Sequence, residues 1–364
     1  MSRVAYVVAY RDPHYVRTRT LTTAIASLDD VDLIVVRNRL RGALRYPETW
    51  LRACWARLRH RPDVWVVGFR GHESFAFLYP IMRGRRIVFD EFINLHGWLV
   101  DERRVLRAES RITRALDAYV RWAMRRSDVV LADTDADADY SARVYGLSPS
   151  KFIVVPVGAD ESTFFPRPRP DRDTGPLEVL FVATMLPLHG VDVFLEAIRL
   201  LQARGRLDAV HVTVIGGRGK RGAVDAIGGF IREHRLEGAV THIPWVDYSH
   251  LPEHVARAGL CIGGPLGDTP QAHRVVTGKT FQFLAMGKAT LVGETSATTR
   301  FADKENCLLV RQGSAEAVAD AIAWAADHRA ELDEIGTRGR AYFEAAFAAR
   351  HVAAAVAPAL RPRR

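Results

Sequence analysis

The chain has 364 residues, of which 48% are hydrophobic and 26% charged, a composition typical of a soluble globular protein with two domains. No run approaches the roughly 20 apolar residues of a membrane-spanning helix, and the apolar run at residues 4–10 is too short for a signal peptide. The three cysteines form no C-x-x-C pair, which argues against a disulfide or metal framework. Residues 1–150 hold 25 Arg and no Lys against 18 Asp and Glu, so most of the net charge of +9 lies there. That excess predicts an anionic neighbour: membrane lipid, a phosphate-linked acceptor or nucleic acid.

Apolar runs of strand length alternate with helical patterns along the whole chain, which predicts a parallel α/β architecture. Six strands are expected in each half, at residues 4–9, 33–37, 64–68, 86–89, 129–132 and 152–156, then 178–182, 210–215, 240–243, 259–263, 289–291 and 307–310. The longest helix of the first half is expected at residues 105–126, and residues 315–359 are nearly all helix formers.

Basic residues accompany two of the expected helices of the first half. Six arginines recur at spacings of three, four and seven and are expected on one helix face: Arg104, Arg107, Arg111, Arg114, Arg121 and Arg125. The run at residues 50–59 is also basic and amphipathic. A solvated outer face and peripheral attachment to anionic lipid both remain open for these helices.

These elements predict two Rossmann-like α/β/α domains that face a central cleft. The first domain is expected at residues 1–160 and the second at residues 177–342, because residues 161–176 are rich in Pro, Asp and Arg and read as a linker. A C-terminal helix, residues 343–364, is expected to cross back to the first domain. It would use an apolar stripe that contains Tyr342, Phe343, Phe347 and Val352. Ligands are expected at the carboxyl ends of the strands.

Two loops in the second half combine a strand end with the start of a helix. The first runs to Thr184, His189 and Gly190 before a helical run, and the second contains Gly264 and leads through Arg274 to Lys279 and Thr280. A helix N-terminus offers unpaired N–H groups and partial positive charge to an anion. Together the loops predict a site for the diphosphate of a nucleotide. A further glycine loop begins at Gly216 after a predicted strand.

Residues 178–197 and 261–293 resemble the donor domain of retaining family 4 glycosyltransferases of the GT-B fold. In that family the first loop commonly reads hhGRhhxxKG; here Ala183-Thr184 replaces Gly-Arg and His189 replaces Lys, as in a bacterial and archaeal subgroup with a PLHG loop. The acidic positions of the family's Glu-x7-Glu motif fall on Arg274 and Gln282. Neither is a carboxylate, which leaves the identity of the donor sugar open.

The resemblance and the local chemistry together assign expected roles. Arg274 and Lys279 are expected to stabilise the departing diphosphate, and Asp90 and His96, just after a predicted strand, to orient or deprotonate the acceptor hydroxyl. Seven residues are expected to contact the donor: Thr184, His189, Gly190, Gly216, Gly264, Thr280 and Gln282.

A run of alternating aspartates, Asp133 to Asp139, invites a D-x-D metal interpretation. The run follows a predicted strand and opens a helix, where capping and the helix dipole favour Asp without any metal. We therefore expect no metal site and no cofactor beyond a nucleotide-diphosphate sugar as co-substrate.

The expected function is retaining transfer of a sugar from a nucleotide-diphosphate sugar to a glycan, glycolipid or lipid-linked acceptor. The setting would be cell-surface polysaccharide or glycoconjugate synthesis in the cytoplasm, with peripheral attachment to the inner face of the plasma membrane. One alternative is a two-Rossmann sugar-nucleotide epimerase, which would need no acceptor. The other is a non-catalytic nucleic-acid-binding protein, suggested by the pI of 9.7. The phosphate loops lie in the nearly neutral second half, so no nucleic-acid partner is expected.

Overall fold

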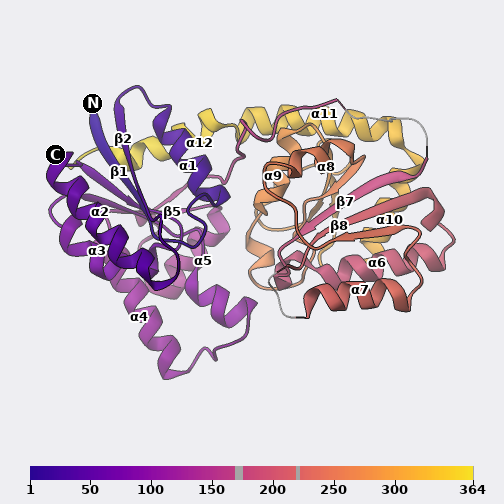
Figure 1. The fold of residues 1–364 in the computed structure, drawn as a ribbon, viewed down its shortest axis with the longest axis horizontal. Helices are drawn as coiled ribbons and strands as arrows, with labels where there is room; N and C mark the ends of the chain where they lie inside the picture. The colour runs from indigo at the N-terminus through magenta and orange to yellow at the C-terminus, as the bar shows by residue number, and fades with distance from the viewer. Residues whose placement is uncertain (169–174, 219–221, 364) are drawn as a thin grey trace. The chain divides into compact units, whose positions relative to one another are not determined.

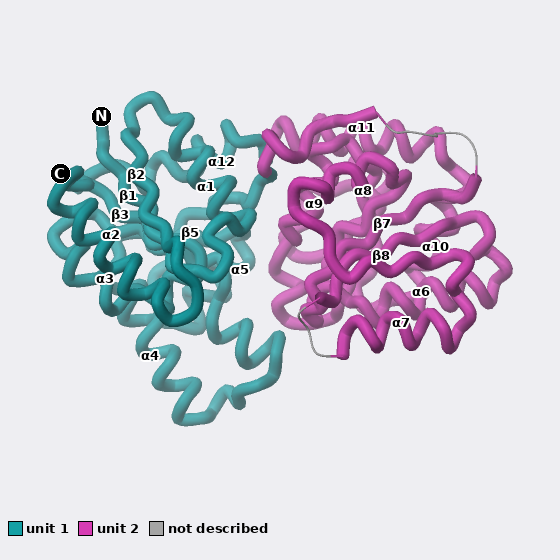
Figure 2. Tube along the Cα trace, in the orientation of Figure 1, with its two compact units in different colours: residues 1–159, 347–364 teal, residues 160–346 magenta. Residues whose placement is uncertain are grey.

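The computed structural model describes residues 1–168, 175–218 and 222–363. The chain divides into two compact units (Figure 2), unit 1 with Met1–Ala159 and Phe347–Arg364, and unit 2 with Asp160–Ala346. The expected linker is thus grouped with unit 2, and its residues 169–174 lie outside the described residues. Within the described part of the chain, no helix has the length and apolarity to cross a bilayer.

Unit 1 is a six-stranded parallel sheet with helices on both faces (Figure 1). In order across the sheet, the strands are β2 (Val31–Arg37), β1 (Ser2–Val8), β3 (Val64–Val67), β4 (Arg86–Asp90), β5 (Val129–Ala132) and β6 (Phe152–Val154). The helices are α1 (Val16–Ala26), α2 (Arg45–Arg59), α3 (Phe75–Met82), α4 (Arg111–Arg126), α5 (Asp135–Tyr145) and α12 (Ala349–Val356). The six strands expected from apolar runs in this half are confirmed.

The alternation of side chains along β1 builds two cores, one on each face of the sheet. Val4, Tyr6 and Val8 pack with residues of α1 and α12, whereas Ala5 and Val7 pack with residues of α2, α3 and α4. Successive side chains of a strand point to opposite faces, and parallel strands are buried on both.

The expected helix at residues 105–126 begins later than the spacing of its arginines suggested. α4 starts after Ser110, whose side chain accepts a hydrogen bond from the backbone N–H of Thr113 at 3.0 Å. Arg104 has a left-handed φ of 50° and, like Arg107, precedes the helix. The single six-arginine face was therefore wrong; Arg111, Arg114, Arg121 and Arg125 remain on α4.

Unit 2 is also a six-stranded parallel sheet between helices (Figure 1). Across the sheet the strands are β12 (Leu308–Val310), β11 (Ala289–Gly293), β10 (Leu260–Ile262), β7 (Leu177–Ala183), β8 (Val210–Gly216) and β9 (Val240–Ile243). The helices are α6 (Val191–Ala203), α7 (Ala223–Glu233), α8 (Leu251–Arg257), α9 (Gly278–Ala285), α10 (Ala315–Asp327) and α11 (Arg329–Ala346). The six strands expected in this half are also present.

The C-terminal helical region changes units between α11 and α12. Tyr342 packs edge-on against Phe301 and Phe343 is fully buried, both in unit 2, whereas Val352 lies in the core of unit 1. The expected continuous stripe is therefore divided, and the segment that belongs to unit 1 begins at Phe347 rather than at residue 343.

Each sheet has one point where the strand order reverses direction. In unit 1 the chain passes from β1 to β2 on one side and later to β3 on the other; in unit 2, β8 and β10 flank β7 in the same way. Ligands of open α/β sheets bind at the carboxyl ends of the strands beside such a point. The topology thus marks the loops after β7 and β10, and those after β1 and β3.

Candidate functional site

The loops that follow β7 and β10 pack directly on each other in unit 2. The backbone N–H of Gly267 donates to the carbonyl of Leu188 at 3.1 Å. Gly190 has a φ of 61°, and a Cβ added there would meet the backbone of Leu266 and Gly267. A side chain at Gly267 would in turn collide with the carbonyl of Pro187. The two loops identified from the sequence therefore form one site at the switch point of the sheet.

His189 is held inside this site as a neutral imidazole. Its Nδ1 accepts a hydrogen bond from the backbone N–H of Thr184 at 3.0 Å, which assigns the remaining proton to Nε2. Burial, and then the charge of Lys279, lower the pKa of His189 well below its ordinary value. His189 can thus donate a hydrogen bond from Nε2 to a phosphate oxygen, but it adds no positive charge near neutral pH.

Lys279, in the first turn of α9, reaches back to the end of β7. Its Nζ donates to the carbonyl of Val182 at 2.7 Å and lies 4.5 Å from the ring centroid of Phe181. Desolvation lowers the pKa of Lys279 to about 7. Burial therefore disfavours the ammonium form of Lys279, and a bound anion would favour it.

Two threonine hydroxyl groups at the N-terminus of α9 make hydrogen bonds to neighbouring groups instead of capping the helix. The Oγ1 of Thr277 donates to the carbonyl of Gly263 at 2.6 Å and makes no capping hydrogen bond to α9. The Oγ1 of Thr280 lies 3.1 Å from that of Thr277 and is fully buried. The Thr280 side chain thus supports the loop, and its backbone N–H donates to the carbonyl of Thr277 at 3.0 Å, so the N–H groups of Gly278 and Lys279 are the ones that the start of α9 offers to an anion.

The other expected donor residues of unit 2 lie around this core. Gly264 has a φ of 70° beside Lys279, and Arg274 ends a short 3-10 helix, Ala272–Arg274, just before α9. Gln282 is on α9 but only 6% exposed, which leaves little surface for a ribose hydroxyl. Gly216 has a φ of 143°, and a side chain there would collide with the carbonyl of Ala183. Its role is close strand packing; Gly219 and Lys220 of the same loop lie outside the described residues.

A pocket of about 520 Å³ opens beside the second loop, at the carboxyl ends of β11 and β12. It is lined by Asp268, His273, Glu294, Arg311, Gln312 and Gly313. The Nε2 of His273 lies 2.7 Å from the carboxylate of Asp268. This mixed polar lining suits a hydroxylated ligand such as a sugar better than an apolar one.

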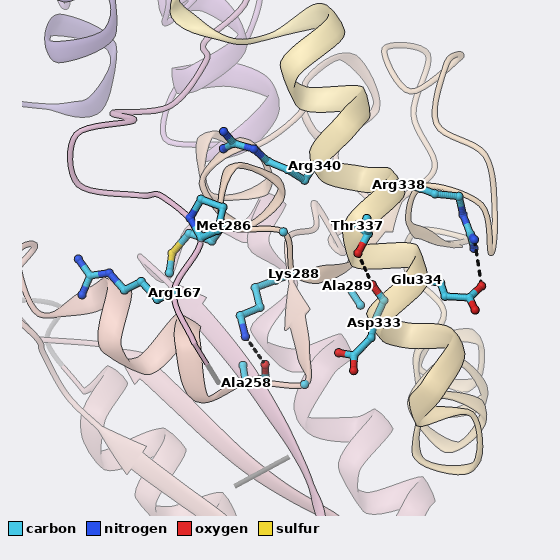
Figure 3. Close-up of a pocket in the computed structure, with 13 residues that line it drawn as sticks. Arg167, Ala258, Met286, Lys288, Ala289, Asp333, Glu334, Thr337, Arg338 and Arg340 are labelled. Carbon is cyan, nitrogen blue, oxygen red and sulfur yellow. Dashed lines mark hydrogen bonds and ion pairs between the residues drawn. The ribbon is translucent and has the colours of Figure 1, made fainter. Parts of the chain in front are cut away.

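A second pocket of unit 2, about 610 Å³, lies at the amino ends of the strands, opposite to the loops after β7 and β10 (Figure 3). Lys288 donates there to the carbonyls of Ala256 and Ala258, at 2.6 and 3.1 Å, and Arg338 pairs with Glu334 at 3.2 Å. Because these cations are engaged and the pocket is at the amino ends of β10 and β11, we do not assign the nucleotide to it.

In unit 1, Asp90 ends β4 as a buried partner of Arg17. Arg17 Nη2 and Nε donate to its Oδ1 at 3.0 and 3.1 Å, and Nη1 donates to the carbonyl of Val155 at 2.8 Å. Both side chains are fully covered. Desolvation raises the pKa of Asp90 against the opposing charge of Arg17. This geometry engages the carboxylate of Asp90 with Arg17 and encloses it, and its expected role as an acceptor-facing base stays a prediction.

His96 is better placed for acid–base chemistry. Its Nδ1 lies 2.9 Å from the Oδ2 of Asp117 on α4, and its side chain is partly accessible. A carboxylate at one ring nitrogen orients the imidazole and leaves Nε2 to face a hydroxyl. The partner Asp117 is 21 positions away in the sequence and was not anticipated.

An aromatic cluster follows β1, β3 and β4 at the switch point of unit 1. The rings of Tyr15 and Phe69 stack with centroids 4.2 Å apart, Tyr10 meets Phe69 edge-on at 4.9 Å, and Phe92 lies 5.7 Å from Phe69. The guanidinium of Arg70 is within 5.7 Å of the Tyr10 ring. Sequence reasoning missed this cluster, although aromatic residues soon after three of the first four strands were the available signal.

Glu91, Asp133 and Asp137 form a group of buried carboxyl groups in unit 1. Desolvation, and then the charge of Asp137, raise the pKa of both Glu91 and Asp133. Asp137 also occupies the first turn of α5, where Thr134 is the N-cap and accepts from its N–H at 3.1 Å. Among the described residues, no three His, Cys, Asp or Glu side chains are arranged to hold a metal ion.

Family comparisons cover most of the chain in two parts. Residues 5–163 match the family described as Glycosyltransferase Family 4, and residues 176–328 match the family described as Glycosyl transferases group 1. A D-inositol 3-phosphate glycosyltransferase of Kineococcus radiotolerans is 31% identical over 145 residues, which are 37% of this chain and 33% of that protein. The match thus spans about a third of the length of this curated relative.

Solved structures of similar fold extend over the whole chain. Anabaena HepE in complex with UDP and glucose has a TM-score of 0.72 at 13% identity and 99% coverage of both chains. Sucrose-phosphate synthase from Thermosynechococcus elongatus has a TM-score of 0.71 at 15% identity and 98% coverage of both. With two parallel-sheet α/β units, the fold is GT-B, as expected from the sequence.

Proposed function

Both halves of this GT-B chain carry glycosyltransferase domains, and from that premise we propose that it transfers a sugar from a nucleotide-diphosphate sugar to a hydroxyl acceptor with retention. One observation carries the proposal most directly. The loops after β7 and β10 pack together at a switch point and present His189, Lys279 and the start of α9 to one anion. A diphosphate fits this chemistry.

Charge on the departing diphosphate would be stabilised by these preorganised donors. The bond between the anomeric carbon and the diphosphate breaks, the acceptor oxygen bonds to that carbon from the same face, and the acceptor proton passes to the leaving phosphate. Lys279, Arg274 and the first N–H groups of α9 would bind the diphosphate, and His189 would donate from Nε2. No metal ion is required in this scheme.

For the acceptor we propose the carboxyl edge of the unit 1 sheet. The partly exposed rings of Tyr10, Tyr15 and Phe92, which pack around the buried Phe69, would contact a sugar or cyclitol, and His96, oriented by Asp117, would contact the reacting hydroxyl. A saccharide or lipid-linked acceptor, used at the cytoplasmic face of the membrane in cell-surface glycoconjugate synthesis, is consistent with the basic first half.

A transfer assay tests the proposal. A thermal-shift screen of nucleotides and nucleotide sugars selects the donor, because a ligand at 100 times its Kd stabilises by roughly 2.7 kcal/mol. UDP leads the panel, since a structure of similar fold binds it, and D-inositol 3-phosphate leads the acceptors. We expect an α-linked product from an α-linked donor, with unchanged rate in EDTA. Product of inverted configuration, or activity lost to EDTA and restored by manganese, would contradict retention or metal independence respectively.

The same assay separates the two alternatives. A sugar-nucleotide epimerase would convert the nucleotide sugar without any acceptor. A nucleic-acid-binding protein would be stabilised in the thermal-shift screen by an oligonucleotide but not by any nucleotide sugar. The glycosyltransferase domains in both halves favour transfer over either.

The lowered pKa of Lys279 predicts a pH dependence of nucleotide binding. The free site, with a Lys279 pKa of about 7, binds fewer protons above neutrality than a site whose ammonium is paired with diphosphate. Affinity for nucleoside diphosphate should therefore fall as pH rises from about 7.5 to 9, by up to about tenfold per unit. Calorimetry in buffers of different ionisation enthalpy should show proton uptake on binding.

A matched variant identifies the group responsible for that uptake. Lys279→Arg keeps its charge across this range, so its affinity should be independent of pH. Equal slopes for the two proteins would assign the proton uptake to another residue.

A further inference from the structure

Helix α2 of unit 1 carries a second apolar face that the fold leaves open. Leu51, Trp55 and Leu58 are 62%, 60% and 78% exposed and lie at i, i+4 and i+7, on one side of the helix. Leu44, 62% exposed and seven residues before Leu51, extends the same row. We call Leu44, Leu51, Trp55 and Leu58 the α2 stripe.

The opposite face of α2 already supplies the contacts that hold the helix. Thr49, Ala53 and Ala56 are buried, and the two alanines belong to the core that α2 forms with β1, β2 and α3. The residues of the α2 stripe therefore do not contribute to the core of unit 1. Contiguous exposed apolar surface rimmed by charge marks an interaction site.

A basic pocket of about 350 Å³ lies beside α2, between it, α1 and the end of β2. Arg19, Arg37, Arg39 and Arg52 line it together with His14, and its described lining contains no carboxylate. We call it the arginine pocket. Burial, and then the charges of Arg37 and Arg19, lower the pKa of His14, which indicates a positive potential before any anion binds.

Glu48 joins the pocket to the stripe. Its Oε2 accepts from the backbone N–H groups of Arg39 and Leu40 at 2.8 and 2.7 Å, and its Oε1 accepts from Arg52 Nε at 2.8 Å. The loop that carries Arg39 is thereby fixed to the helix that carries Trp55. Pocket and stripe thus share helix α2, which contributes Arg52 to the pocket and Leu51 to the stripe.

We propose that the α2 stripe and the arginine pocket form a docking surface for an anionic phospholipid bilayer, in which the stripe enters the acyl boundary and the pocket holds a lipid phosphate. This proposal specifies how the enzyme of the proposed function would bind a membrane, and it can be tested independently of sugar transfer.

The charge distribution favours lipid over a protein partner. On the helical wheel, Arg52 and Arg59 flank one side of the stripe. An apolar stripe that contains tryptophan and is bordered by arginines is the pattern of a helix that lies in the membrane interface. The guanidinium groups that line the arginine pocket can each donate two parallel hydrogen bonds to the oxygens of a phosphate.

Vesicle co-sedimentation of the full chain tests the surface, with phosphatidylcholine vesicles and with phosphatidylcholine containing a quarter phosphatidylglycerol. The wild type should bind both, and the anionic vesicles at least tenfold more tightly. Trp55→Ser with Leu58→Ser should weaken binding to both at least tenfold. Arg37→Gln with Arg39→Gln should remove the preference for anionic vesicles and keep the weaker binding to neutral ones.

The matched control replaces exposed apolar residues elsewhere in unit 1. Val105 and Ile112 are 63% and 62% exposed beside the arginines of α4, and Val105→Ser with Ile112→Ser should bind vesicles like the wild type. Loss of binding in this control alone would overturn the assignment to α2, as would an unaffected stripe variant.

Three further outcomes discriminate between occupants and functions. Binding of inorganic phosphate or D-inositol 3-phosphate to the arginine pocket without vesicle binding would overturn the lipid proposal in favour of a soluble anion. A wild-type dimer that dissociates in the stripe variant and ignores vesicles would assign the stripe to a second copy. Unchanged nucleoside diphosphate binding in all variants shows that the docking surface, and not the proposed donor site, was altered.

Discussion

Asp90→Asn is expected to lower the free energy of unfolding of unit 1 by about 3–5 kcal/mol, the cost of removing one partner from a buried ion pair. The amide would leave the guanidinium of Arg17 charged and covered, since both side chains of the pair are fully buried. Urea unfolding should show this loss in the transition of unit 1, while the transition of unit 2 stays in place. The two transitions are followed separately because multidomain chains are not two-state.

A double variant distinguishes a structural from a catalytic Asp90. Arg17→Met with Asp90→Leu removes both charges and should recover most of the stability, because apolar replacement of a buried pair is often neutral. If this folded double variant retains transfer activity, Asp90 acts only through the fold. A stable Asp90→Asn protein without activity would instead restore the catalytic role expected from the sequence.

Lys279→Ala is expected to weaken nucleoside diphosphate binding by about 1–3 kcal/mol, or roughly 5- to 150-fold. The ammonium lies between the end of β7 and the start of α9, where it donates to the carbonyl of Val182 and would gain a phosphate partner. Isothermal titration of UDP and other nucleoside diphosphates at pH 7 measures the change.

Lys304→Ala is the matched control for that variant. Lys304 is also in unit 2, and its Nζ packs over the ring of Trp324 at 4.5 Å, away from the donor loops. Its affinity should equal that of the wild type. Equal losses in both variants would indicate a general electrostatic effect, and no loss in Lys279→Ala would move the nucleotide to another site.

Several features of this protein could be predicted from the sequence because the signals are local. The twelve apolar runs correspond to the strands of the described residues, since strands buried on both faces need continuous apolar side chains. The two loops of the proposed donor site could be selected because glycine, a strand end and a helix start occur within a few residues of one another, at Gly190 and again at Gly264. Both predictions rest on signals contained within short chain segments, so they require no knowledge of contacts between distant residues.

Only the tertiary structure decided which of the candidate side chains are buried and which groups they contact. The carboxyl of Asp90 looked available until Arg17, 73 positions earlier, was placed against it. Thr280 is turned inward by Thr277, and the pKa of Lys279 is lowered by the apolar surroundings that packing creates. The second apolar face of α2 has the same origin, because a helical pattern shows which residues share a side but not which side the sheet will cover. Burial is a property of neighbours distant in the chain, and the charge, exposure and role of each side chain follow from it.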